Sequence, residues 1–581
     1  MGITLDYVTI AIYFVVLLGV GFLTGRGKRA SSDSYFLSKG TLPWWVIGAA
    51  YVATGMNTEQ LIGQNGVGYQ SGLVMANWYL AVPVVYGALI YFFYPVYLRN
   101  GIRTMPEYLG KRFNGACQNV FAVFLIVSYV LMNLAVVFYG GAVLLANVFP
   151  LVADNSAANL WLWLAVLSLV SGLYTMYGGE SSMVYGAFIQ FLLIFVAGVA
   201  LIGFAYCQMP GGLSDLCKVP DPGYLRLIHP MASNPIPWHA ILVTMFGLHL
   251  YYSCINQSLV QRGFGARTEW DARMAIVFAG AFVLLRPFVE IIPGMMARAI
   301  YEVSPDSAIG QAFDFGLRNN LSGYAPDRVL PKMISTLVPS GLQGLMVVGI
   351  LAGVMSTISA LLNSISTLFT YDVYKKWINP RADDKRLVMI GSLTTLTLMV
   401  FSIGYAPQIQ RMGGIFVYFQ TAASYFAVPI ASVFLMGMFW KRTTPAAALA
   451  VILCGIPCGM LLDWYILEGQ PLMIGGRILI PQLLPTAFVE AWNTKNIFVC
   501  SGINQAFLML VMGVISLFTR PRPEAEIRPL MWSVDKFFLP PGEPKHPLLQ
   551  SVGFWFVILT FIYVVIYVIS VVSQRFHSNS P

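Results

Sequence analysis

The chain contains about fourteen runs of roughly 20 mostly apolar residues, each long enough for a helix to cross the hydrocarbon core of a membrane. Hydrophobic residues fill 57% of the 581 positions and charged residues only 10%, a balance that excludes an ordinary soluble protein. We therefore predict an all-α, multi-pass membrane protein with about 14 transmembrane helices. The runs lie near residues 5–25, 42–70, 72–98, 117–148, 159–177, 184–206, 237–263, 273–300, 339–376, 386–408, 411–439, 446–466, 494–519 and 550–574.

The net charge of +9 comes from Lys and Arg residues that sit mostly in short connections between the apolar runs. This distribution indicates membrane topology rather than nucleic-acid binding. If the first run crosses from outside to inside, basic connections such as "QRGFGARTEWDAR" and "YKKWINPRADDKR" face the cytoplasm. We therefore expect a protein of the plasma membrane or the bacterial inner membrane, with both termini external.

Two of the apolar runs are interrupted by polar residues at the depth where a helix that faces lipid would be apolar. The stretch "AYVATGMNTEQLIGQNG" interrupts the second run, and "LHLYYSCINQSLVQR" interrupts the run five spans later. Broken helices in corresponding places of two halves are typical of transporters built from an inverted repeat, in which unwound backbone lines a central binding site. The predicted parts are listed in chain order: residues 1–41 (first helix and cytoplasmic loop), 42–206 (first repeat), 207–236 (external loop), 237–439 (second repeat) and 440–581 (three further helices and loops).

Other membrane functions lack their sequence signals in this chain. The sequence has no HExxH or GxSxG motif, no paired intramembrane aspartates and no histidines at metal-ligand spacing, so we expect no enzyme. It also has no repeated pore helix or filter motif of a channel. A transporter is the class that remains.

Several long motifs, in order, resemble the sodium/solute symporter family, and specifically its sodium/glucose cotransporter branch. They are "YFLSKGTLPWWVIGAAYVATGMNTEQLIG", "TMPEYLGKRF", "NQSLVQR", "LLNSISTLFTYDVYKK" and "PIASVFLMGMFWKRTT". The resemblance runs nearly end to end and implies a LeuT-like fold of five-plus-five inverted repeats, with sodium as the coupling ion and no organic cofactor.

The resemblance also implies a sodium site in the run "GVMSTISALLNS", residues 353–364, whose small hydroxyl groups are unusual in a buried helix. In the family, carbonyl groups at a helix break and two adjacent hydroxyls hold the ion. The corresponding residues are Ala53, Met56 and Gly353 for the carbonyls and Ser356 and Thr357 for the hydroxyls. Oxygen ligands suit a hard cation, although small residues in such a run also serve close helix packing.

The family's sugar site corresponds to Gln60, Tyr79, Val82, His249, Tyr252, Val283 and Gln420, with Gln64, Trp78 and Phe416 at the gate positions. Amides donate and accept hydrogen bonds, and aromatic faces stack on sugar rings, so Gln60, Tyr252 and Gln420 suit a polyhydroxy ligand. Three positions depart from the family: Tyr79 replaces a carboxylate, His249 an amide and Val283 a lysine. Core packing is the alternative role for Tyr79 and His249.

Arg286 and Glu290 lie three and seven residues after Val283, on the same face of a predicted helix. Charges inside a membrane are candidates for function, but these two are also spaced to pair with each other. Arg286 is therefore either half of a structural ion pair or a contact for an anionic substrate.

We predict a sodium-coupled symporter that imports a sugar or related polyhydroxy solute by alternating access. Relatives that carry a second sodium ion have an aspartate where this chain has Ala187, so the resemblance implies one sodium ion per substrate. The alternatives are uptake of a sugar acid or another organic anion, and a sodium-dependent sensor that transports nothing. The expected partners are a small-molecule substrate and the lipid bilayer, without nucleic acid or an obligatory protein partner.

Overall fold

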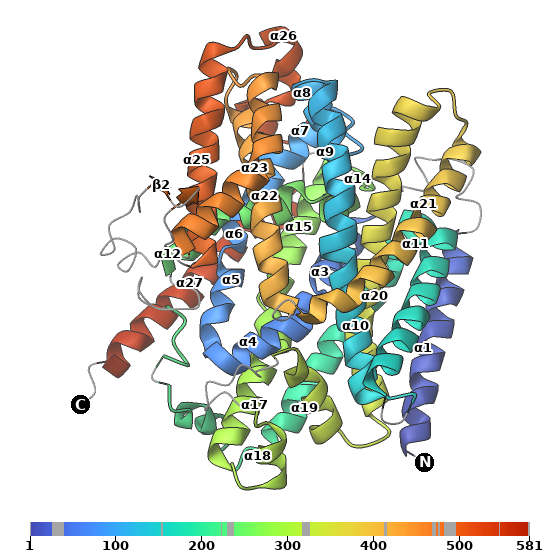
Figure 1. Ribbon diagram of the computed structural model, residues 1–581, viewed down its shortest axis with the longest axis vertical. Helices are drawn as coiled ribbons and strands as arrows, with labels where there is room; N and C mark the ends of the chain where they lie inside the picture. The colour runs from blue at the N-terminus through green and yellow to red at the C-terminus, as the bar shows by residue number, and fades with distance from the viewer. Residues whose placement is uncertain are drawn as a thin grey trace. The chain divides into compact units, whose positions relative to one another are not determined.

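The computed structural model describes residues 2–25, 40–152, 155–221, 223–228, 238–315, 326–411, 415–467, 472–474, 477–480, 496–544 and 546–578. Figure 1 shows the described helices and strands coloured in chain order from blue to red. Their internal contacts divide the chain into two units, each assembled from segments that are far apart in sequence. The first unit comprises residues 1–79, 126–226 and 261–419. The second comprises residues 80–125, 227–260 and 420–581.

The described residues of the first unit form helices joined by turns and loops, with no β-strand among them. Its α-helices are α1 (Gly2–Gly25), α3 (Trp44–Gly55), α4 (Gln64–Ser71), α10 (Ala135–Val148), α11 (Ser156–Tyr206), α15 (Glu269–Val283), α16 (Arg286–Glu290), α17 (Ile292–Val303), α18 (Ala308–Ala312), α19 (Val329–Leu337), α20 (Gln343–Leu368) and α21 (Asp384–Tyr405). Short 3₁₀ or π turns are η2 (Glu59–Gly63), η3 (Gly72–Ala76), η5 (Tyr129–Leu134), η6 (Gly212–Lys218), η9 (Pro326–Arg328), η10 (Phe369–Ile378) and η11 (Ala406–Arg411).

The second unit combines helices with one short hairpin of antiparallel strands, β1 (Leu472–Ile474) and β2 (Arg477–Ile480). Its helices are α6 (Val82–Ala88), α7 (Tyr94–Arg99), α8 (Met105–Arg112), α12 (Trp238–Phe246), α13 (Leu248–Leu250), α23 (Pro445–Leu467), α25 (Ile497–Phe518), α26 (Glu524–Ile527) and α27 (Val552–Ser578), with the turns η4 (Leu89–Phe93), η7 (Tyr251–Ile255), η12 (Arg528–Leu530), η13 (Val534–Phe537) and η14 (Leu548–Gln550). Four helices run from one unit into the other: α5 (Asn77–Leu80), α9 (Gly115–Ser128), α14 (Gln257–Phe264) and α22 (Ile415–Phe439).

Among the described residues, ten helical stretches are long and apolar enough to cross a membrane, and each overlaps one of the predicted runs. The predicted count of fourteen is not confirmed: three runs are divided into shorter helices, and α1 is counted separately. In α1 the apolar stretch found among described residues is the shorter Thr4–Gly19. The runs at 42–70, 237–263 and 273–300 are each divided into shorter helices.

The run at 273–300 is divided by two prolines. Proline lacks a backbone N–H and cannot continue a helix from the preceding turn. Pro287 stands in the first turn of α16, and Pro293 stands in the first turn of α17, so each starts a new segment. The result is a chain of short helices, α15, α16 and α17, in place of one continuous span.

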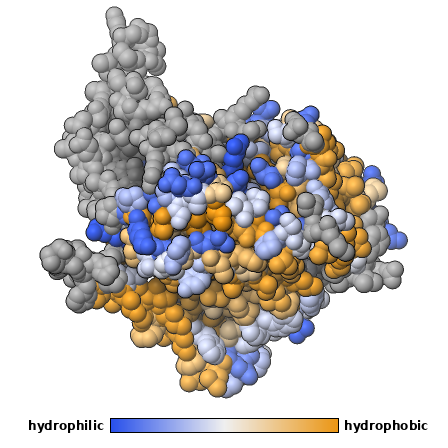
Figure 2. All heavy atoms as spheres, turned by 90° about the horizontal axis from the view of Figure 1, so that it is seen from below, coloured by the Kyte–Doolittle hydropathy of each residue, from blue (hydrophilic) through white to orange (hydrophobic). Residues whose placement is uncertain are grey.

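Helix α20 forms the centre of the first unit and packs against α1, α3, α10 and α11. The contact with α11 is close because Gly349 has no side chain: a Cβ there would lie 2.2 Å from the Cβ of Ala197. The outer face of α11 is apolar and exposed, for example at Val196 and Val199, as expected of a surface that meets lipid. Figure 2 likewise shows apolar side chains over much of the described surface on the face it draws.

Candidate functional site

The first interrupted helix breaks after Gly55, where α3 ends. Met56 leaves the helical region with φ −97° and ψ 64°. The chain resumes with the π turn η2, and the Asn57 side chain accepts a hydrogen bond from Gln60 N at 3.1 Å. A break of this kind exposes backbone carbonyls that a continuous helix would use internally.

Helix α20 packs directly against this break. A Cβ on Gly353 would lie 2.4 Å from the Met56 carbonyl oxygen, so only glycine permits this approach. One turn later, the Thr357 hydroxyl lies 3.0 Å from the carbonyl oxygen of Thr54 and 3.1 Å from that of Gly353. The break that carries Met56 and the part of α20 that carries Gly353 and Thr357 are therefore in contact within the first unit.

The Ser356 hydroxyl is the unusual member of this group. Its side chain is buried, with 1% of the residue exposed, and its Oγ has no hydrogen-bond partner among the described residues. Burying a hydroxyl without a partner is unfavourable by about 1 to 3 kcal/mol, so such an atom calls for an explanation. A hard cation supplies one, because neutral hydroxyl and carbonyl oxygens are suitable ligands for it. The residues present thus fit a sodium ion.

A network of polar side chains continues from the far side of the break. Gln60 Nε2 donates to Glu59 Oε2 at 2.7 Å, and Gln64 Nε2 lies 2.5 Å from Gln60 Oε1. The Tyr79 hydroxyl lies 2.6 Å from Gln64 Oε1 and also contacts the carboxylate of Glu290. The proposed substrate residues Gln60 and Tyr79 and the gate residue Gln64 are therefore linked to one another, and the link to Glu290 was not predicted.

Arg286 closes this network. Its Nε and Nη2 lie 3.0 Å and 2.9 Å from Glu290 Oε1, so the pair expected from the sequence forms. The same guanidinium also donates to the Gly55 carbonyl at 2.9 Å and to Gln60 Oε1 at 3.3 Å. Its carbon atom stands 4.9 Å from the centre of the Tyr79 ring, a cation–π distance.

Asn65, which the sequence analysis did not select, joins the two interrupted helices of the first unit. Its Nδ2 donates to the carbonyls of Leu61 at 2.7 Å and Val289 at 3.1 Å. Its Oδ1 accepts from the N–H of Gly294 at 2.9 Å. The side chain therefore satisfies backbone groups that the division between α16 and α17 leaves without helical partners. The asparagine itself lies in the quoted polar stretch, but nothing in the sequence indicates its partner.

The remaining polar residues of the predicted substrate site belong to the second unit. His249 is buried in α13, Tyr252 lies in the π turn η7, and Gln420 is buried in α22. The gate residue Trp78 is buried in α5, in the part assigned to the first unit. Phe416 lies in α22, but its side chain is outside the described residues. A shared substrate pocket for all these residues stays a prediction.

Helix α22 begins at Ile415, whose N–H donates to Asp327 Oδ2 at 3.0 Å. Asp327 lies in η9, outside the membrane-spanning helices, and burial raises the pKa of its carboxyl group to about 6. The hydrogen bond from Ile415 opposes that rise because it favours the charged form. The helix that carries Gln420 is therefore capped by a group that titrates near neutral pH.

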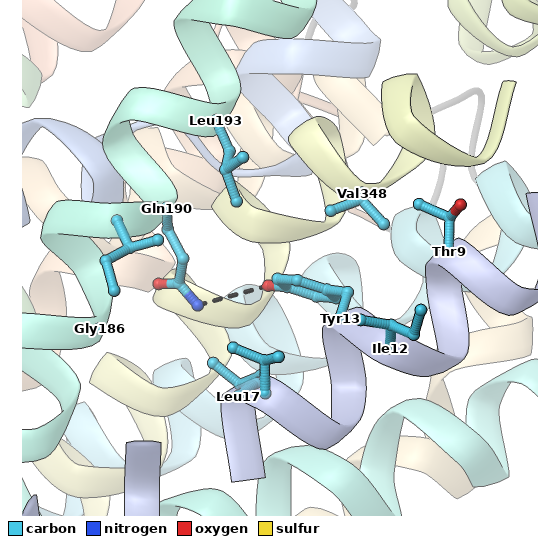
Figure 3. Close-up of a pocket in the computed structure, with 10 residues that line it drawn as sticks. Thr9, Ile12, Tyr13, Leu17, Gly186, Gln190, Leu193 and Val348 are labelled. Atoms are coloured by element: carbon cyan, nitrogen blue, oxygen red, sulfur yellow. Dashed lines mark hydrogen bonds between the residues drawn. The ribbon is translucent and has the colours of Figure 1, made fainter. Parts of the chain in front are cut away.

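One groove is described outside this region, between α1, α11 and α20 (Figure 3). Its lining is mainly apolar, and the amide of Gln190 reaches the Tyr13 hydroxyl at 3.5 Å rather than projecting a free polar group. Such a surface suits hydrocarbon better than a polyhydroxy molecule. We do not assign the substrate to it.

Comparison with known proteins gives a family match that covers most of the chain. The model of the Sodium:solute symporter family matches residues 35–455. The sodium/glucose cotransporter of Vibrio parahaemolyticus is 31% identical over 475 residues, covering 79% of this chain and 85% of that protein. The human sodium/myo-inositol cotransporter 2 is 28% identical over 580 residues, covering 94% of this chain and 82% of its own length.

A solved structure shares the fold. It is a Na⁺-coupled sialic acid symporter in a substrate-bound, outward-open state, with a TM-score of 0.71 at 18% identity. The alignment covers 89% of this chain and 98% of the symporter. At this identity the likeness concerns the fold alone.

Proposed function

The chain belongs to the sodium:solute symporter family, and we propose that it uses a sodium gradient to import an uncharged polyhydroxy compound, either a sugar or a cyclic polyol. Its family and relatives are transporters rather than enzymes, and sodium is the coupling ion of the family. The relatives named for glucose and myo-inositol support this substrate class.

The single observation that carries sodium coupling is the buried Ser356 hydroxyl, which has no hydrogen-bond partner among the described residues and lies on the helix that packs against the break. We propose that Ser356 and Thr357, with the carbonyls of Ala53, Met56 and Gly353, hold the ion. When bound, sodium supplies the positive charge that draws these oxygens together. Neutral ligands also allow it to leave again on the other side of the membrane.

The contacts of Arg286 favour an uncharged substrate over a sugar acid. An arginine that recruits a substrate carboxylate must offer donors to it, whereas Nε and Nη2 of this guanidinium are already bonded to Glu290, Gly55 and Gln60. Breaking the buried pair to bind an anion would leave Glu290 without its positive partner, which is strongly unfavourable. Gln60 and Tyr79, together with His249, Tyr252 and Gln420, remain the proposed substrate contacts, with Gln64, Trp78 and Phe416 as gates.

The transport mechanism that we propose is alternating access by two five-helix inverted repeats, residues 42–206 and 237–439. The oxygens of the break and of α20 would come together in the outward-open state and separate in the inward-open state. The bias between the two states would be the difference in their affinity for sodium. We further propose that both termini are external and that one sodium ion moves with each substrate.

The test is uptake into proteoliposomes that contain the purified protein, using labelled glucose, myo-inositol and glucuronate with and without a sodium gradient. We expect sodium-dependent uptake of glucose or myo-inositol and none of glucuronate. Uptake of glucuronate alone would instead establish the sugar-acid alternative. A sensor would bind a sugar but fail to exchange internal unlabelled for external labelled substrate, so counterflow separates that class.

A further inference from the structure

We propose that Arg286 is a positioning residue that couples the sodium site to the substrate pocket, because one guanidinium holds both the end of the broken helix and a substrate-binding amide. The inference rests on the proposed function, because it assigns to Arg286 the link between sodium binding and substrate binding. Arg286 itself would touch neither sodium nor substrate.

The contacts of Arg286 span the segment between the two sites. Gly55, whose carbonyl it binds at 2.9 Å, immediately precedes the proposed sodium ligand Met56. Gln60, whose amide oxygen it binds at 3.3 Å, is the proposed substrate contact four residues beyond Met56. The segment from 55 to 60 is thus held at both ends by the same planar group.

A single nitrogen of Arg286, Nη2, makes both contacts. Its N–H bonds are fixed in the guanidinium plane, and the bond from Nε to Glu290 fixes that plane, so the two acceptors are held at a defined spacing. A rotation of the peptide at Gly55, next to a carbonyl that we propose turns towards sodium, therefore displaces the donor on which Gln60 depends. Sodium binding is then expected to orient Gln60 for substrate, and removal of this planar group to separate the two events.

Glu290 provides the anchor for this arrangement. Its side chain is completely buried and contacts both Arg286 and the Tyr79 hydroxyl. A purely structural ion pair would need only the bonds between Arg286 and Glu290. Here the guanidinium also reaches two acceptors on a different segment, and it stacks on the ring of Tyr79.

A second buried pair in the same unit supplies the matched control. Arg298 and Glu302 on α17 have the same four-residue spacing, lie 2.7 Å apart, and their arginine is as buried as Arg286, with 9% exposed in each case. Arg298 stacks on Tyr69 rather than on a predicted substrate residue. Neutralising this pair removes the same two charges but leaves the segment from 55 to 60 untouched.

The experiment measures the dissociation constants of labelled glucose and myo-inositol at 5 and 100 mM sodium, on the full-length protein in detergent. The ratio of the two constants for whichever sugar binds is the coupling. We expect a parental ratio of about tenfold or more. Arg286→Gln with Glu290→Gln should lower the ratio below about threefold while the rise in melting temperature caused by sodium alone persists. Arg298→Gln with Glu302→Gln should keep the parental ratio.

Arg286→Lys keeps a positive charge to pair with Glu290 but replaces the planar guanidinium by a flexible ammonium group, so it carries the test if the double variant does not fold. We expect it to lower the coupling ratio to an intermediate value. A folded double variant or Arg286→Lys with parental coupling would overturn the inference and leave the proposed function intact. A parent protein that binds neither sugar at either sodium concentration would overturn the proposed function, and this inference with it.

Discussion

Replacing Ser356 by alanine should weaken sodium binding without destabilising the sodium-free protein. The hydroxyl is buried and bonded to no described residue, so its removal breaks no structural hydrogen bond. Thr357→Ala is the instructive contrast, because the Thr357 hydroxyl lies 3.0 Å from the Thr54 carbonyl and its loss removes a contact between α20 and the break. Only the second variant should lower the stability of the protein in the absence of sodium.

The expected magnitude follows from the ligand set. A hydrogen bond or ligand contact to a charged partner contributes about 1.5 to 3 kcal/mol, so losing one of five proposed oxygens should raise the sodium concentration for half-maximal binding about 10- to 100-fold. In the sodium-free protein, removing an unpaired buried hydroxyl should leave the free energy of unfolding unchanged or raise it by about 1 kcal/mol.

The assay is the melting temperature of the purified protein against sodium concentration, with potassium replacing sodium at constant ionic strength. Ser364→Ala, two turns further along α20, deletes the same atom from an equally buried serine and serves as the control. The ion site is refuted if Ser356→Ala keeps the parental sodium dependence. A large loss of stability in the absence of sodium would show that the hydroxyl has a structural partner.

Three further predictions concern stability, pH and stoichiometry. Asn65→Ala should lower the free energy of unfolding by about 2 to 4 kcal/mol, because it leaves the Val289 carbonyl and the Gly294 N–H without this hydrogen-bond partner. Asn147→Ala, on an exposed helix face, should change the free energy of unfolding little. Denaturant unfolding in detergent compares the two variants. Burial raises the pKa of Asp327 from 3.8 to about 6, so the folded protein binds this proton more tightly than the unfolded chain. The free energy of unfolding should therefore rise as pH falls, by about 1.3 kcal/mol between pH 7 and 5. Asp327→Asn should abolish that component in a thermal-shift series across this range. A result in which parent and Asp327→Asn show equal pH dependence contradicts the assignment. One sodium ion per neutral substrate, with a potential of about 100 mV and a tenfold sodium gradient, supports roughly 500-fold accumulation, and reversal potentials that require two charges per substrate would disprove that stoichiometry.

The proposed sodium site was predicted from the family resemblance rather than from the local sequence. Hydroxyls at 356 and 357 within an apolar run, together with a polar interruption after Thr54, suit oxygen ligands near a helix break, but small residues in such a run also serve close helix packing. The sequence does not reveal that the Thr357 hydroxyl bonds to a carbonyl while that of Ser356 does not. That difference depends on how α20 is rotated against α3. The contacting residues Thr54 and Thr357 are 303 positions apart, so no local sequence pattern determines this rotation.

The polar network was only partly predictable for the same reason. The pairing of Arg286 with Glu290 follows from four-residue spacing on one helix. The contact of Glu290 with Tyr79 joins residues 211 positions apart, and no local pattern indicates it. Hydrophobic runs indicate which residues avoid water, but they do not show whether the backbone remains helical. In the run at 273–300, Pro287 and Pro293 divide the helix, although the run is apolar enough to be predicted as one span.

The position of these charges bears on why a tyrosine and a valine are acceptable where the family resemblance places a carboxylate at 79 and a lysine at 283. Glu290 contacts the Tyr79 hydroxyl, and Arg286 begins α16 three residues after Val283. The chain thus still carries one negative and one positive group near these positions, but they bond to each other and to the broken segment instead of being held separately. A pair neutralised in this way presents a substrate with amides and hydroxyls rather than with a net charge. The chain should therefore discriminate among polyhydroxy compounds by the arrangement of their hydroxyl groups. Uptake of myo-inositol should differ from uptake of its stereoisomers, and replacing one hydroxyl of any isomer by a charged group should abolish uptake.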